Sequence, residues 1–82
     1  MDRAEILDKL KKIFAEVKDV DVKELDFVDE STSIKDQLGL NSIGVLYIVV
    51  AIEKQFDIDM QSGETDRFVT VGDVVDFLCE EL

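Results

Sequence analysis

Apolar side chains recur every three or four residues in the first part of the chain, with lysines and acids between them. This spacing predicts an amphipathic helix over about residues 3–17, with one side packed into a core. Asp2 can cap its first turn, while Glu5 and Lys18 complement the helix dipole at its two ends. The apolar positions of this helix are Ile6, Leu7, Leu10, Ile13, Phe14 and Val17.

A second apolar segment runs without interruption from Val45 to Ile52 and therefore has no period of its own. Such a run fits a buried strand or a helix, and it is far shorter than the roughly 20 residues that cross a bilayer. Its flanks favour a helix of about fifteen residues that ends at Phe56, because helix formers extend the run beyond the usual length of a strand. Gly39 supplies a turn before it, and Asn41 or Ser42 can cap its start.

The two sides of this second helix are expected to differ in role. One side should line the core, and the other must be covered or offered to a partner, because more than half of the circumference is apolar. The expected core side consists of Ile43, Leu46, Val49, Val50, Ile52 and Phe56, and the other side consists of Val45, Tyr47, Ile48 and Ala51.

The remaining segments are less regular. Residues 19–35 have scattered apolar positions without a sustained period, so we expect a long ordered loop that the apolar residues tether to the core. One short helical turn is expected near Glu64 to Phe68. Thr70 and Asp73 form a T-x-x-D start signal for a last helix that continues to the C-terminus, with Cys79 in the core or at its boundary.

Length and composition limit the architecture to one unit. Eighty-two residues with 46% apolar content can form one core but not a second. We therefore predict a single all-α domain over residues 1–82: a bundle of three long helices and one short helix, with a long loop between the first and second helices.

The formal net charge of −11 argues against nucleic acid and anionic lipid as partners and favours partners with basic surfaces. The charge is uneven, since residues 36–82 hold ten acids and two bases. A single cysteine and the lack of a signal-peptide pattern at the start lead us to expect a cytoplasmic protein. We also expect a monomer without stable membrane insertion.

The residue composition argues against a catalytic site. Without histidine, a serine or cysteine nucleophile has no imidazole base, and one cysteine without histidine is not a zinc site. Asp57 and Asp59 begin an EF-hand-like pattern, but Ser62 stands at the glycine position and Phe68 at the position of the bidentate glutamate. The sequence therefore predicts neither an enzyme nor a metal site.

Two segments resemble the acyl carrier protein family. The segment "LGLNSIGVLYIVVAIEKQFDI", Leu38 to Ile58, is similar to the family pattern L-G-x-D-S-L followed by a helix that ends in L-E-x-x-F. The segment "TVGDVVDFL", Thr70 to Leu78, resembles the start of the family's last helix, and no gap is needed between the two. The resemblance covers most of the chain.

This resemblance implies a four-helix acyl-carrier-protein-like bundle in which Ser42 begins the second long helix and carries covalent 4′-phosphopantetheine. A phosphopantetheinyl transferase would attach the group from coenzyme A, and its terminal thiol would hold an acyl group as a thioester. The implied partners are acyltransferases, synthases or acyl-activating enzymes, in fatty-acid or specialised lipid or polyketide biosynthesis. Two alternatives stay open: a peptidyl or D-alanyl carrier of the same fold, and an unmodified helical interaction module in which Ser42 is only a cap.

Departures from the family pattern fall where partners commonly dock. Asn41 replaces an aspartate, Gly44 and Tyr47 replace acids, and Lys54 reverses a charge. We therefore expect a mixed apolar and acidic contact surface and a dedicated pathway rather than general fatty-acid elongation. The residues expected to contact partners are Asn41, Ile43, Gly44, Val45, Tyr47, Ile48, Glu53 and Asp66.

Overall fold

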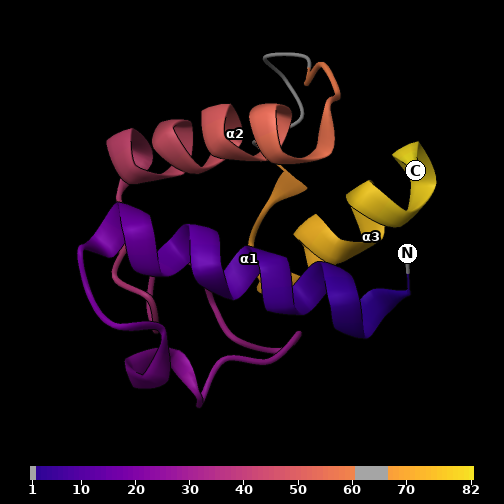
Figure 1. The fold of residues 1–82 in the computed structure, drawn as a ribbon. Helices are drawn as coiled ribbons and strands as arrows, with labels where there is room; N and C mark the ends of the chain where they lie inside the picture. The colour runs from indigo at the N-terminus through magenta and orange to yellow at the C-terminus, as the bar shows by residue number, and fades with distance from the viewer. Residues whose placement is uncertain (1, 61–66) are drawn as a thin grey trace.

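The computed structural model describes residues 2–60 and 67–82, and within these ranges the fold is all helical, as predicted. The elements are α1 (Arg3–Lys18), a short 3₁₀ helix η1 (Val22–Leu25), α2 (Ser42–Phe56) and α3 (Val71–Glu81). Both α2 and α3 pack against α1, and the connection from α1 to α2 runs below α1 in the view of Figure 1. None of the helices in the described part of the chain is long and apolar enough to span a membrane.

Helix α1 confirms the first prediction almost to the residue. The Asp2 side chain accepts a hydrogen bond from the Glu5 amide at 2.8 Å, and Asp19 ends the helix in the left-handed conformation with φ of 57°. The buried side chains are those of the predicted apolar side with Ala15 added, while Leu7 and Val17 are partly buried at its edge: Ile6, Leu10, Ile13, Phe14 and Ala15.

The predicted orientation of α2 was wrong in part. Ile52 and Phe56 are buried as expected, with 0% and 8% of their surface exposed, but Ile48, which was assigned to the other side, is also buried at 2%. Ile43, Leu46 and Val50 were expected in the core and are 63%, 59% and 48% exposed. An uninterrupted apolar run carries no information on which side packs inward, so contacts with α1 and the loop decide it. The polar end of the helix did indicate the exposed side. Lys54 is exposed, and in an α-helix it lies on the same side as Val50, four residues earlier.

The segment between α1 and α2 is more structured than a plain loop. Asp21 and Glu24 form a capping box that starts η1, an element that the scattered apolar pattern did not predict. Backbone hydrogen bonds fasten the segment to the start of α3 and the residues just before it, from the Ile34 amide to the Val69 carbonyl at 3.0 Å and from the Val71 amide to the Thr32 carbonyl at 2.9 Å. The buried apolar residues of the segment are Leu25, Val28, Ile34, Leu38 and Leu40.

Helix α3 begins where the T-x-x-D signal predicted. Thr70 and Asp73 form a complete capping box, and the amide of Gly72 donates to the Glu30 carbonyl at 2.8 Å. Gly72 allows this approach, because a Cβ built there would lie 2.7 Å from the same carbonyl oxygen. The short helical turn predicted near Glu64 lies mostly outside the described residues.

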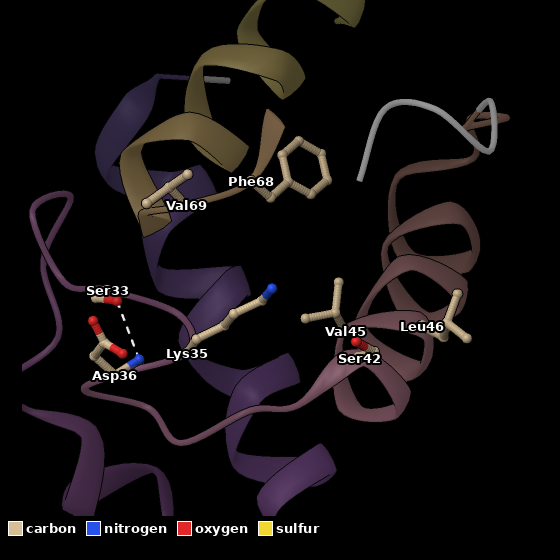
Figure 2. A pocket seen from close by; sticks show the side chains of 8 residues that line it. All are labelled: Ser33, Lys35, Asp36, Ser42, Val45, Leu46, Phe68 and Val69. Carbon is tan, nitrogen blue, oxygen red and sulfur yellow. Dashed lines mark hydrogen bonds between the residues drawn. The ribbon is translucent and has the colours of Figure 1, made fainter. Parts of the chain in front are cut away.

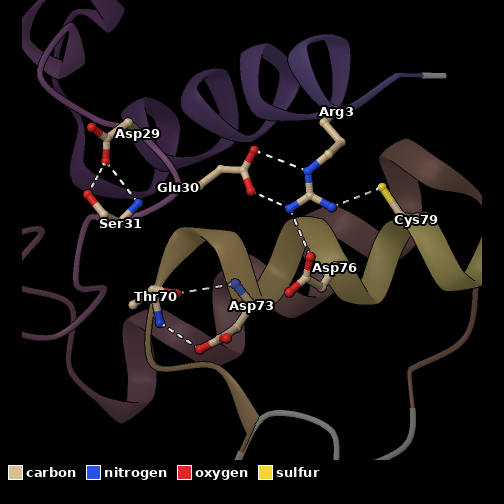
Figure 3. A network of polar contacts seen from close by, with 8 residues as sticks. All are labelled: Arg3, Asp29, Glu30, Ser31, Thr70, Asp73, Asp76 and Cys79. Atoms are coloured by element: carbon tan, nitrogen blue, oxygen red, sulfur yellow. Dashed lines mark hydrogen bonds and ion pairs between the residues drawn. The ribbon is translucent and has the colours of Figure 1, made fainter.

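Cys79, which was expected in the core or at its boundary, is exposed on α3. Its Sγ lies 3.9 Å from the Arg3 guanidinium, which also contacts Glu30 and lies 2.8 Å from Asp76 Oδ1 (Figure 3). These groups join the start of α1, the loop and α3. Because all of them are exposed, the ion pairs add little to the free energy of unfolding.

The backbone amides of Thr70 and Val69 hold the pKa of Asp73 below its ordinary value of 3.8. A depressed pKa in the folded state stabilises the fold above the unfolded-state value, and this contribution is lost as the pH falls through the folded pKa. We expect Asp73→Asn to be less stable than wild type by about 0.3–1 kcal/mol at pH 7. Urea unfolding at pH 7 and pH 3 should show this difference shrinking at the lower pH. Asp59→Asn, in the loop after α2, serves as the control, and a difference for Asp73→Asn that grew on acidification would contradict the argument.

Candidate functional site

Ser42 is the first residue of α2, but it is not the residue that caps the helix. Asn41 has that role, since its Oδ1 accepts a hydrogen bond from the Gly44 amide and its carbonyl accepts one from the Val45 amide, both at 2.9 Å. Ser42 itself is exposed. Because Asn41 caps the helix, the Ser42 hydroxyl is not needed for capping and is free to react.

The loop before Ser42 is built to hold the helix start in place. Gly39 adopts a left-handed conformation with φ of 69°, between the buried side chains of Leu38 and Leu40. The Lys18 ammonium donates to the Leu38 carbonyl at 2.5 Å and so ties this loop to the end of α1. Leu40 also accounts for Gly44, because a Cβ built there would lie only 3.1 Å from Leu40 Cδ2.

A cavity of about 460 Å³ opens beside the serine, between the loop, the start of α2 and the segment before α3. Figure 2 shows Ser42 and Val45 on the α2 side and Phe68 and Val69 on the opposite side. The Lys35 side chain extends from the loop toward α2. The residues that line the cavity are Ser33, Lys35, Asp36, Ser42, Val45, Leu46, Phe68 and Val69.

Among residues 2–60 and 67–82, the cavity offers no catalytic apparatus for activating Ser42. Asp36 is the one carboxylate among its lining residues, and residues 2–60 and 67–82 contain no cluster of three or more potential metal ligands. The chain has no histidine. An exposed serine without a base is suited to receive a group from another enzyme rather than to attack a substrate by itself.

The helix start suits a negatively charged group. The Ser42 and Ile43 amides belong to the first turn and have no hydrogen-bond acceptor among the described residues. Together with the positive end of the helix dipole, they favour an anion such as a phosphodiester on the serine oxygen. The apolar wall formed by Val45, Phe68 and Val69 can contact the less polar parts of an attached arm.

The residues that were predicted to contact partners differ in exposure and in their distance along the chain from Ser42. Asn41, Ile43 and Tyr47 are exposed, and Gly44 and Val45 are half-buried beside Ser42. The prediction for Ile48 was wrong, because this side chain is in the core. Two further residues lie farther along the chain: Glu53 is half-buried and accepts a hydrogen bond from the Met60 amide at 3.2 Å, and Asp66 is outside the described residues.

Two surface residues were not predicted to contact partners, because their spacing had assigned them to the core side of the helix. Leu46 and Val50 join Ile43 and Tyr47 in one exposed row along α2, at spacings of three and four residues. We call these four residues the α2 stripe. It begins next to Ser42, and Leu46 also lines the cavity.

Comparison with known proteins gives a consistent result. A family model described as the phosphopantetheine attachment site matches residues 8–78. The chain is 35% identical over 78 residues to the acyl carrier protein of Caulobacter vibrioides, across 95% of this chain and 96% of the relative. It is 35% identical over 75 residues to that of Clostridium perfringens, across 92% and 95%. With that of Campylobacter fetus the identity is 33% over 70 residues, across 80% and 91%.

Proposed function

Because the chain belongs to the acyl carrier proteins, which hold acyl groups on phosphopantetheine, we propose that Ser42 is the residue that bears this group. The chain is thus a carrier and not an enzyme. The observation that supports Ser42 is its position: an exposed hydroxyl on the first turn of α2, relieved of capping by Asn41 and open to a cavity. The domain boundaries 1–82, a monomeric state and a cytoplasmic location stay predictions from the sequence.

The chain's own groups have defined tasks in this proposal. The arm supplies the thiol on which acyl groups are held as thioesters. The amides of Ser42 and Ile43 would hold the phosphate of the attached group, and the helix dipole would stabilise its charge. The base that takes the serine proton during attachment comes from the transferase, since the cavity has no histidine to act as one.

Members of the family interact with synthases and transferases, and the α2 stripe supports a specific docking mode. Its four apolar side chains lie next to the attachment serine on a protein with a net charge of −11. A partner that fits has an apolar patch for the stripe and a basic rim for the surrounding acids. Phosphopantetheinyl transferases, acyltransferases, synthases and acyl-activating enzymes with such surfaces are the proposed partners.

The attachment is tested by intact-mass measurement after incubation with coenzyme A and a promiscuous phosphopantetheinyl transferase. We expect a gain of one phosphopantetheine group per chain, and peptide mapping should place it on the fragment that contains Ser42. A chain that gains no mass would contradict the proposal, and a group on a different fragment would contradict the assignment to Ser42.

We also propose that this carrier serves a dedicated acyl pathway. The α2 stripe is apolar, and Tyr47, which stands where the family pattern has an acid, is 65% exposed. The holo protein should be turned over by general fatty-acid elongation enzymes with kcat/KM reduced by about tenfold relative to a housekeeping carrier, the effect of losing about 1.4 kcal/mol of contacts. Equal turnover of the two carriers in the same assay would remove the reason for this proposal.

A further inference from the structure

We propose that Lys35 is a positioning residue for the prosthetic arm: its ammonium pairs with the phosphodiester on Ser42 and draws the first part of the arm into the cavity. This inference rests on Ser42 as the attachment residue. It concerns a loop residue that neither the sequence pattern nor the helix start singles out.

The cavity places a cation opposite the serine. Lys35 lies on the loop between α1 and α2, and Figure 2 shows its side chain extending toward Val45 on α2, with the nitrogen drawn below the Phe68 ring. Ser42 lies on the α2 side of the same cavity. A phosphate bonded to the serine oxygen would share this cavity with the Lys35 ammonium.

Lys35 makes no hydrogen bond or ion pair with any residue in the ranges 2–60 and 67–82. The nearest acid in sequence is Asp36, which also lines the cavity and whose amide donates to Ser33 Oγ at 3.1 Å. Asp36 and Lys35, both of which the structure describes, form no ion pair with each other. The lysine is thus free to exchange its hydration for contact with a phosphate oxygen.

The other nearby cations are committed or distant. Lys18 donates to the Leu38 carbonyl, and Arg67 lies 3.8 Å from Glu80 on α3. Lys54 is on the last turn of α2, roughly 18 Å along the helix axis from Ser42 at 1.5 Å per residue. In the described part of this acidic protein, Lys35 is the one basic residue that lines the cavity.

An exposed ion pair has a small effect that salt screens, so the expected changes are modest and measurable. We expect Lys35→Gln to raise the fraction of time that the arm spends outside the cavity by roughly two- to fivefold, as loss of one exposed pair would. Lys35→Arg should keep the wild-type behaviour. Lys23→Gln, on η1, removes an exposed lysine that does not line the cavity and is the matched control.

The experiment uses holo protein with a ¹³C-labelled arm, after intact mass has shown complete loading of each variant. Paramagnetic relaxation by a soluble probe reports the exposure of the arm, and ³¹P NMR reports the environment of the phosphodiester. In Lys35→Gln we expect increased relaxation of the labelled methyl groups and a shifted ³¹P signal, and in wild type increased relaxation at 1 M salt. Lys23→Gln and Lys35→Arg should match wild type.

The outcomes separate the two proposals. Equal arm relaxation and ³¹P signals in wild type and Lys35→Gln, with full loading of both, would overturn the role of Lys35 and leave Ser42 as the attachment residue. A Lys35→Gln protein that resists loading would place Lys35 in transferase recognition and also overturn the positioning role. Absence of loading in wild type would overturn both proposals.

Discussion

Ser42→Ala is expected to abolish loading with phosphopantetheine completely while leaving the fold unchanged. Asn41, not Ser42, caps α2, and alanine has a high intrinsic helix propensity, so the helix start tolerates it at this exposed position. The free energy of unfolding should therefore change by no more than about 0.5 kcal/mol. Intact mass after incubation with coenzyme A and a transferase measures the loss of loading, and urea unfolding measures stability.

Asn41→Ala is the matched control for this experiment, because it changes the adjacent residue and leaves the hydroxyl in place. It removes the side chain that accepts from the Gly44 amide, so we expect a loss of about 1 kcal/mol in the free energy of unfolding. Loading of Asn41→Ala should still go to completion at long incubation times. An adduct on Ser42→Ala, or complete unfolding of that variant, would contradict the assignment.

The parts of the fold that the sequence predicted well depend on short-range signals. Asp2, Thr70 and Asp73 cap the helices that they were expected to cap, because a cap is decided by hydrogen bonds within three or four residues. The same holds for the turn at Gly39, whose φ of 69° suits a residue without a side chain. Ser42 was singled out because its flanks match a family pattern, and its role as the attachment residue stays a prediction.

The parts that failed depend on contacts between distant segments. The orientation of α2 follows from packing of Ile48 and Ile52 against the rest of the core, which no period within an apolar run can show. The cavity is likewise formed by segments that are far apart in sequence, at Lys35, Val45 and Phe68. The position of Lys35 in this cavity therefore could not be predicted from the sequence, because it depends on the path of the loop.

The second large effect is expected from Ile48→Ala, compared with Leu46→Ala two residues earlier on the same helix. Both changes remove side chains with the same number of carbon atoms. Ile48 is 2% exposed, so its truncation should leave a cavity and lower the free energy of unfolding by about 2–4 kcal/mol. Leu46 is 59% exposed, so its truncation should cost no more than about 0.5 kcal/mol. Urea unfolding of the two variants measures both values.

The same pair separates stability from recognition. Because Leu46 belongs to the α2 stripe and lines the cavity beside Ser42, Leu46→Ala should lower kcat/KM with an acyl-transferring partner by about tenfold, as loss of an interface contact of about 1.4 kcal/mol would. Ile48→Ala, assayed below its unfolding transition, should retain most of its turnover because the side chain is hidden from the partner. If Leu46→Ala proved the less stable variant, α2 would instead face the core with the side first expected from its sequence. The docking surface would then lie on the opposite side of the helix.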